Sequence, residues 1–205
     1  MVPALLAGLT GVVQGARHAL EPDHVTAVAT LMVEAPSPRR GIFYATCWGM
    51  GHAAMLLLVA GPLVVMRVEL PQALSVALEL AVGAMLVFLG VRALRPRRGV
   101  PQPSLAPLHV RGRRPFAIGV MHGLAGSGAL AALIALSTPA MLVGLASLVL
   151  YAVGTVLGMI ALAMLAGPLL AKIEHLPHMT ASISRIAGGL SVVVGIAWVV
   201  RTLAE

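Results

Sequence analysis

The segment "GARHALEPDHVTAVAT", residues 15–30, places a proline and several ionisable side chains inside an otherwise apolar stretch that runs from Val2 to Val33. An ionisable group at membrane depth costs about 2.5–3.5 kcal/mol on insertion scales, so such groups persist mainly where they line a polar cavity or bind something. The segment therefore predicts a buried polar site within the first apolar stretch. Its ionisable residues are Arg17, His18, Glu21, Asp23 and His24.

The composition around this segment is that of a membrane protein. The chain is 59% hydrophobic and 10% charged, with a mean hydropathy of +0.97, whereas soluble domains carry about 25% charged residues. The net charge of +7 does not indicate nucleic-acid binding, because the arginines cluster in short segments beside apolar runs and act as topology signals. The single cysteine, Cys47, excludes an internal disulfide and a paired-thiol redox relay. We expect the first apolar segment to be retained, since it lacks the basic start and cleavage site of a signal peptide.

Six apolar runs are long enough to cross a bilayer, which takes about 20 residues each. They predict an all-α membrane protein of six transmembrane helices, arranged as a three-helix repeat at 1–94 and a second at 115–205. An Arg/Pro-rich cytoplasmic linker at 95–114 separates the two. The runs lie at about 2–33 (interrupted), 42–66, 72–94, 116–137, 140–170 and 183–203.

The basic residues predict the orientation of these spans. With the linker in the cytoplasm, eleven Lys and Arg residues lie inside, and only Arg67 and Arg201 lie outside. Cytoplasmic loops carry the excess of Lys and Arg. We therefore expect a multi-pass protein of a bacterial-type cytoplasmic membrane, with both termini outside.

The two halves resemble one another in order. "GARHALEPDHVTAV" aligns with "GVMHGLAGSGALAA", so that Gly15 matches Gly119 and His18 matches His122. "LLLVAGPLV" aligns with "LAMLAGPLL", and "GAMLVFLGV" with "GGLSVVVGI", at nearly constant offsets of 104 to 106 residues. A repeat with an odd number of spans inserts in opposite orientations, which is the inverted-repeat plan of many secondary transporters, with a midplane site on broken helices.

The first polar segment cannot form a single site on a regular helix. On an ideal helix, Asp23 lies about 140° and His24 about 240° around the axis from His18. Pro22 cannot continue the hydrogen-bonding pattern of the preceding turn, so we expect the first helix to break near Pro22. The break would turn His18, Asp23 and His24 towards a common centre, where two imidazoles and a carboxylate suit Ni²⁺, Co²⁺ or Zn²⁺.

Further candidate residues come from the second, fourth and fifth spans. His52 in "GMGHA" follows glycines that permit close helix approach. His122 and Ser127 in "HGLAGSG" take the places of His18 and Asp23 in the second half. Each histidine either binds the ion or only hydrogen-bonds a neighbouring helix.

The fifth span offers Gly158 and Met159 nearly at the place of Gly51 and His52. A methionine thioether there would be at most a weak, soft ligand. Met159 is therefore a residue of the ion pathway rather than an expected principal ligand.

The remaining charged residues have more than one interpretation. Glu79 in "ALELAVG" is either a coupling carboxylate, a partner for Arg17 or a water-facing group. Arg17 either neutralises Glu21 or repels cations from a resting site. The whole first cluster also has a purely structural interpretation, in which its histidines and Asp23 pair with Arg17.

The motifs resemble those of a known family. "HALEPDH" has the H-x-x-x-x-D-H pattern of the nickel/cobalt transporter (NiCoT) family, and with "GMGHA" and "HGLAGSGAL" the chain is similar to its six-span, urease-accessory UreH-type relatives. The resemblance implies a metal-selecting motif at His18, Asp23 and His24 and a Gly-His motif at Gly51 and His52. It also implies nickel-enzyme maturation machinery as a partner. The acidic motifs typical of the family's second half are absent here, and relatives include importers and exporters.

We therefore predict a secondary transporter of Ni²⁺ or Co²⁺, not an enzyme, with the metal as substrate and no organic cofactor. The ion would lose most of its water to His18, Asp23, His24 and His52 and leave after the two halves rock. No Walker motif indicates direct use of ATP.

Two other functions fit less of the sequence. Export of a small, sulfite-like anion is favoured by Arg17 and by the positive ends of half-helices, but not by two histidines and an aspartate. A membrane metalloenzyme would use Glu21 or Asp23 as a base, but the chain has no H-E-x-x-H motif.

Overall fold

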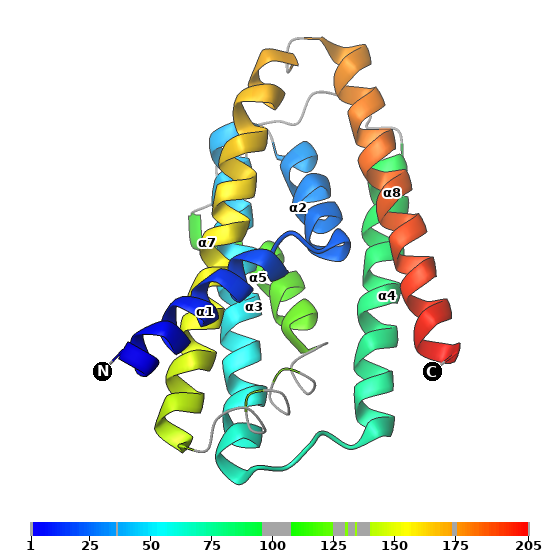
Figure 1. Cartoon of the computed structure of the whole chain (residues 1–205). Helices are drawn as coiled ribbons and strands as arrows, with labels where there is room; N and C mark the ends of the chain where they lie inside the picture. The colour runs from blue at the N-terminus through cyan, green and yellow to red at the C-terminus, as the bar shows by residue number, and fades with distance from the viewer. Residues whose placement is uncertain are drawn as a thin grey trace.

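The fold is known from a computed structural model, which describes residues 2–35, 37–95, 108–124, 130, 134, 140–173 and 176–204. All secondary structure within these residues is helical (Figure 1), which confirms the predicted all-α class. The described helices are α1 (Val2–His18), α2 (Pro22–Glu34), α3 (Pro38–Met66), α4 (Gln72–Leu94), α5 (Leu108–Leu124), α7 (Met141–Ile173) and α8 (Pro177–Ala204).

Four of the described helices are long and apolar enough to cross a membrane, by length and composition. They cover Pro38–Met66, Gln72–Leu94, Met141–Lys172 and His178–Ala204. The first predicted span forms two shorter helices, and much of the fourth lies outside the described residues. The six-span count therefore stays a prediction. Helix α5 begins at Leu108, inside the segment expected to be linker, so helical structure starts earlier there than the proline content indicated.

The side chains on the outside of the bundle are those of a membrane protein. Large apolar side chains such as Leu58, Leu142 and Leu165, the last 78% exposed, point away from the other helices. Helices that are apolar all round are typical of the interior of a bilayer. The chain is therefore a membrane protein, as its composition indicated.

The first helix breaks where the sequence predicted. Helix α1 ends at His18, and α2 begins at Pro22, which occupies the first turn of the new helix with Glu21 in an extended conformation before it. Proline fits the first turn because the N–H that it lacks has no partner there in any case. In Figure 1, α1 runs obliquely to the middle of the bundle and α2 turns upward from that point.

The helices pack mainly against helices of the other sequence half. Helix α1 packs on α7, α3 packs on α5 and α7, and α4 packs on α8, while α2 lies between α3, α7 and α8. The two halves are thus interleaved rather than separate. A rocking of one half against the other, as expected from the sequence, would break most of these contacts.

Two helix crossings have the same arrangement. A β-carbon on Gly15 of α1 would overlap the carbonyl oxygen of Tyr151 in α7, and one on Gly119 of α5 would overlap that of Trp48 in α3. Side chains larger than hydrogen are excluded at both positions. Each glycine therefore lets two backbones touch, and the two are the glycines matched in the sequence repeat.

The reverse contacts of these crossings match as well, and they correct one pairing. Gly51 lies against the carbonyl of Phe116, and Gly154 lies against the carbonyl of Val12. By packing, the counterpart of Gly51 and His52 is thus Gly154 with the following Thr155. The sequence alignment had placed Gly158 and Met159 there, one helical turn further along.

Helices α4 and α8 approach closely at two pairs of glycines. Gly83 lies against Gly195, and Gly90 lies against Gly188. The hydroxyl of Ser191 donates a hydrogen bond across the same interface to the carbonyl oxygen of Leu86, at 2.9 Å. Small residues and interhelical hydrogen bonds of this kind hold helices together in lipid, where apolar packing alone does not favour one partner.

Candidate metal centre

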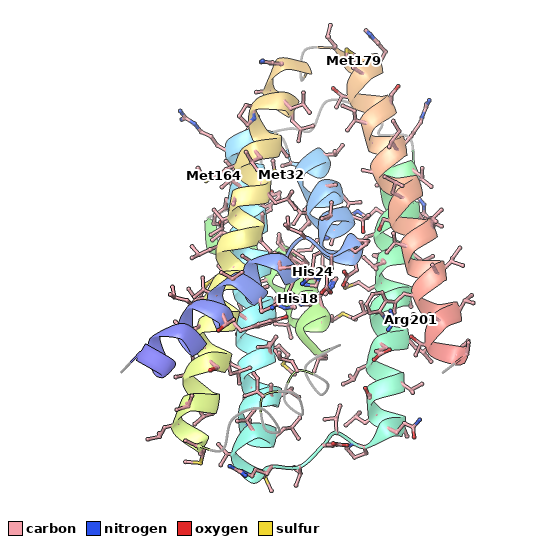
Figure 2. The ribbon with its side chains drawn as sticks, viewed as in Figure 1. His18, His24, Met32, Met164, Met179 and Arg201 are labelled. Atoms are coloured by element: carbon pink, nitrogen blue, oxygen red, sulfur yellow. The ribbon has the colours of Figure 1, made fainter. Side chains whose placement is uncertain are left out.

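Four histidines and one aspartate converge from four helices. His18 ends α1, Asp23 and His24 begin α2, His52 lies in the middle of α3, and His122 lies near the end of α5. Figure 2 places His18 and His24 in the middle of the bundle, at the break between α1 and α2. Except for His18, each of these residues is at most 3% exposed. The structure thus brings together all four predicted ligands and adds His122 from the second half.

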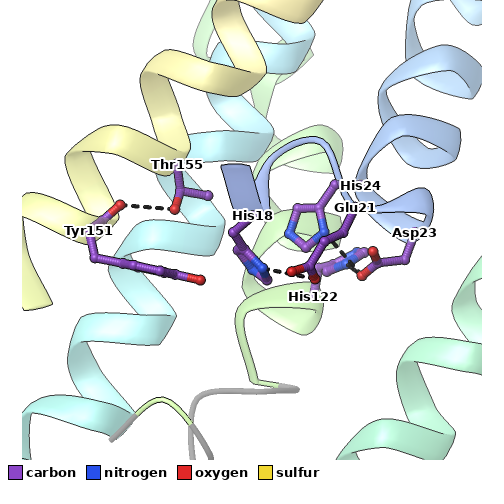
Figure 3. Close-up of polar contacts among 7 residues, drawn as sticks. All are labelled: His18, Glu21, Asp23, His24, His122, Tyr151 and Thr155. Atoms are coloured by element: carbon purple, nitrogen blue, oxygen red, sulfur yellow. Dashed lines mark hydrogen bonds and ion pairs between the residues drawn. The ribbon is translucent and has the colours of Figure 1, made fainter. Parts of the chain in front are cut away.

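The carboxylate of Asp23 joins residues of both halves. Its Oδ2 lies 2.8 Å from Nε2 of His122 and 3.0 Å from Nδ1 of His24 (Figure 3). Asp23 stands in the first turn of α2, where the helix dipole favours a negative charge. Both contacts use Oδ2, and the other oxygen, Oδ1, is buried without a hydrogen-bond partner among the residues that the structure describes.

His24 is the centre of the cluster. Its ring centroid lies 4.2 Å from that of His18, 4.3 Å from that of His122 and 5.0 Å from that of His52. The His18 and His52 rings are 5.6 Å apart, and those of His52 and His122 are 5.8 Å apart. Among these pairs, the ring of His24 is therefore the nearest histidine ring to His18, His52 and His122.

Two groups of side chains have the spacing of a metal site. One is His18, His24 and His52, and the other is Asp23, His24 and His122; within each, one ligand atom per residue lies within 4.8 Å of the others. Ligands at about 2.0–2.2 Å from one ion lie within about 4.4 Å of each other, so small side-chain movements suffice to close either group. Imidazole with carboxylate suits divalent first-row metals.

Several ligand atoms of the cluster are buried and unpaired. Nδ1 of His24 faces the Asp23 carboxylate, but Nε2 of His24, both ring nitrogens of His52 and Nδ1 of His122 have no hydrogen-bond partner within the described chain. A buried polar atom left without a partner costs about 1–3 kcal/mol, and native proteins leave few of them. A bound cation would satisfy these atoms together, whereas a purely structural cluster would be expected to pair them internally.

Glu21 and Arg17 stand at the exposed edge of the cluster. Oε2 of Glu21 lies 3.0 Å from Nδ1 of His18, and the two side chains are 48% and 17% exposed. The Arg17 side chain is exposed. Glu21 therefore pairs with His18. The ion pair between Arg17 and Glu21 that the sequence suggested does not occur among the ion pairs of the described residues.

The other candidate residues lie in different surroundings. Glu79 accepts a hydrogen bond from the hydroxyl of Thr202, at 3.2 Å, between α4 and α8. Met159 is fully buried in the apolar core, with its sulfur against Gly49. Ser127 lies outside the described residues.

Two aromatic residues of the site were missed in the sequence. The ring of Trp48 is fully buried and lies 5.5 Å from His24 and 5.3 Å from His122, and the ring of Tyr151 lies 5.6 Å from His18. Trp48 precedes His52 by four residues, which places both on one face of α3. That spacing was the available signal.

The chain is similar to several known proteins. The family model described as HupE / UreJ protein matches residues 6–202. The urease accessory protein UreH of Bacillus sp. (strain TB-90) is 34% identical over 176 residues, which cover 80% of this chain and 77% of the relative.

Two plant proteins are also similar to the chain over part of their length. The chloroplast proteins FOR GROWTH AND FERTILITY 1 and 2 of Arabidopsis thaliana are 30% and 24% identical to it. The chain spans about half the length of each, 48% and 56%. No solved structure matches the chain.

Proposed function

The chain belongs to the HupE / UreJ protein family, and from this premise we propose that it is a secondary transporter of Ni²⁺, with Co²⁺ as the nearest alternative substrate. The observation that carries the proposal is the convergence of four histidines and Asp23 on one buried cluster with unpaired ligand atoms. Ionisable side chains are costly to place inside a membrane, and where they occur they are typical of substrate and ion pathways.

The choice of nickel has three supports. His18, Asp23 and His24 form the H-x-x-x-x-D-H pattern that the chain has in common with nickel/cobalt transporters. The relative from Bacillus carries the name of a urease accessory protein, which supports our proposal that nickel-enzyme maturation machinery is a partner of this chain. Borderline imidazole nitrogens with a single carboxylate suit Ni²⁺ and Co²⁺ better than the hard ions Mg²⁺ and Ca²⁺.

We propose that His18, Asp23, His24 and His52 are the principal residues that bind the ion along its path, and that His122 is a further one, without all five binding it at once. Their burial removes the ion from water, and the negative charge of Asp23 offsets part of its charge. The side chain of Trp48 walls the cluster and excludes water from that side.

The proposed architecture is an inverted repeat of residues 1–94 and 115–205, joined by a cytoplasmic linker at 95–114. The matched glycine contacts of the two halves support it. The start of α1 and the end of α8 both lie in the lower half of Figure 1, on the side of the α3–α4 connection, which agrees with two termini on the outer face.

The moving parts are proposed to be groups of helices drawn from both halves. Helices α4 and α8 pack closely on each other, and α1, α3, α5 and α7 form a second packed group. Helix α2 carries Asp23 and His24 between these groups. A shift of the α4–α8 pair relative to the other group would open the cluster without breaking the tight crossings.

The two alternative functions have less support. A small anion would meet the buried carboxylate of Asp23 in the cluster, and Arg17, the cation offered for it, is exposed. For a metalloenzyme, Glu21 or Asp23 would serve as the base, but Glu21 pairs with His18 and the carboxylate of Asp23 is engaged by His122 and His24.

Uptake and release of radiolabelled nickel test the proposal. Cells and membrane vesicles of both orientations carrying wild type are compared with Asp23→Asn, which keeps size and removes charge, and with His24→Ala. His178→Ala, at an exposed histidine of α8, is the matched control. We expect both site variants to lose nickel movement by at least tenfold and the control to keep it. Movement of nickel in either direction that survives both substitutions would sink the proposal.

A further inference from the structure

The two ligand groups of the cluster overlap in one residue. The outer set is defined as His18, His24 and His52, and the inner set as Asp23, His24 and His122. Both contain His24, and no other residue belongs to both. The five side chains therefore offer an ion two positions rather than a single five-ligand site.

The two sets differ in exposure and in charge. The outer set includes the half-buried His18, which pairs with the exposed-edge carboxylate of Glu21, and it contains three imidazoles. The inner set is wholly buried and contains the carboxylate of Asp23. An ion arriving with part of its hydration shell fits the outer set, and an ion stripped of water is better stabilised where a negative charge is a ligand.

The hydrogen bonds leave suitable atoms free in each set. Because Nδ1 of His18 pairs with Glu21, its Nε2 is left for an ion; the second nitrogen of a metal-binding histidine commonly pairs with a carboxylate in this way. In the inner set Nε2 of His122 pairs with Oδ2 of Asp23, which leaves Nδ1 of His122 and Oδ1 of Asp23 unpaired.

The shared residue limits the occupancy to one ion. A neutral imidazole has one nitrogen with a free lone pair, while the other carries a proton. His24 can thus bind an ion in the outer set or in the inner set, but not in both. Two divalent ions that shared one histidine would also repel each other strongly.

We propose that the outer and inner sets are two successive positions of one transported ion, and that His24 passes the ion between them. The inference rests on the proposed function and adds to it a second binding position and an order of steps. The ion first binds His18, His24 and His52 and then exchanges His18 and His52 for Asp23 and His122. His24 binds the ion through Nε2 in both sets, because its Nδ1 faces Oδ2 of Asp23 at 3.0 Å. Only metal–ligand bonds therefore form and break, and each ring proton stays on its nitrogen.

Co²⁺ is the probe for the two positions, because its absorption spectrum responds to ligand type and coordination. The full chain in lipid nanodiscs is titrated with Co²⁺, and the number of ions bound and the spectrum are recorded. We compare wild type with His18→Gln, which impairs the outer set, and His122→Gln, which impairs the inner set. His24→Gln impairs both, and His178→Gln is the control.

We expect wild type and control to bind one Co²⁺ per chain. His18→Gln and His122→Gln should each still bind one ion, with spectra that differ from one another, and each should lose transport by at least tenfold. His24→Gln should weaken Co²⁺ binding by at least a hundredfold. Asp23→Asn gives a second, near-isosteric test of the inner set, and its spectrum should match that of His122→Gln.

Three results would overturn the two-position scheme. They are two Co²⁺ ions bound at once to wild type, identical spectra for His18→Gln and His122→Gln, and full binding by His24→Gln. If wild type still transports nickel in such a case, the proposed function survives without the two-position scheme. If wild type neither binds nor moves Ni²⁺ or Co²⁺, the proposed function fails, and the scheme fails with it.

Discussion

The crossing of α5 on α3 and the crossing of α1 on α7 have the same backbone arrangement and different chemistry. In each, a glycine lies against the carbonyl of an aromatic residue, Gly119 on Trp48 and Gly15 on Tyr151. Four residues after the aromatic stands His52 in α3 and Thr155 in α7. The packing is thus the same at both crossings, whereas the histidine is present at only one of them.

His52 and Thr155 differ in whether their polar side-chain atoms have a hydrogen-bond partner among the described residues. Both are fully buried. The hydroxyl of Thr155 donates a hydrogen bond to the carbonyl of Tyr151 in its own helix, at 2.9 Å, while both nitrogens of His52 are unpaired. The matching backbone contacts restrict residue size at both crossings, and the proposed ion would restrict side-chain chemistry only at the crossing that carries His52. An asymmetric site can therefore stand on a nearly symmetric scaffold.

The largest expected effect comes from breaking a crossing. Leucine at Gly119 would overlap the backbone of α3, and no rotamer change relieves a clash of a β-carbon with a backbone atom. We expect Gly119→Leu, and likewise Gly15→Leu, to yield little folded protein in fluorescence-detected size-exclusion chromatography. Gly189→Leu is the control, since a β-carbon there meets nothing within 4 Å. A Gly119→Leu protein that melts like wild type would show that the backbones do not touch at this crossing.

The second effect comes from giving one crossing the side chain of the other. His52→Thr places in α3 the residue that α7 has at the matching position. We expect radiolabelled nickel accumulation to fall at least tenfold, because the outer set loses a ligand. The protein should still fold, because threonine overlaps no neighbouring atom at this position, although the cavity that it leaves lowers the melting temperature. The thermal melting temperature is the check on folding. Nickel accumulation at the wild-type level would remove His52 from the site and make the two crossings equivalent.

The α4–α8 crossing has close glycine packing but, among its described residues, takes no part in the histidine cluster. The Ser191 hydroxyl spans this interface, and interhelical hydrogen bonds in membranes contribute about 0.6 kcal/mol on average. We expect Ser191→Ala to lower the melting temperature by about 1–3 °C without changing nickel transport. Ser182→Ala, at an exposed serine bonded within its own helix, is the control. Lost transport at an unchanged melting temperature would place this interface on the ion path.

The local features of the site were predictable from the sequence, and those set by packing were predictable only in part. Pro22 between His18 and His24 predicted the break, because proline cannot continue a helix but can start one. His122 was suggested by the repeat, but its contact with Asp23 joins residues 99 positions apart and has no local signal. Trp48 and Tyr151 were missed because an aromatic residue in an apolar span is most often ordinary core.

The sequence alignment of the two halves was wrong by one helical turn in the fifth span, where it matched Gly158 instead of Gly154 with Gly51. Gly154 and Gly158 both stand in α7, and the dipeptides that follow from them, Gly-Thr and Gly-Met, are equally compatible with an apolar helix. Only the contact of Gly154 with the carbonyl of Val12 identifies it as the counterpart of Gly51. Matches among Gly, Ala and Leu are too common in an apolar chain to determine how the two halves align. The backbone contacts in the structure determine that alignment directly.

The smallest expected effect is at Thr155, the counterpart of His52. Thr155→Ala removes a hydroxyl that donates its hydrogen bond within its own helix, to the carbonyl oxygen of Tyr151. That carbonyl still accepts its backbone hydrogen bond in the helix after the substitution. A back-bonding threonine of this kind contributes little to helix stability, so we expect nickel accumulation within about twofold of wild type and a melting temperature within about 2 °C. Measured beside His52→Thr, the variant isolates side-chain chemistry at matched backbone positions. A tenfold loss of nickel accumulation in Thr155→Ala would mean that the hydroxyl contacts the moving ion, and both crossings would then contribute to the path.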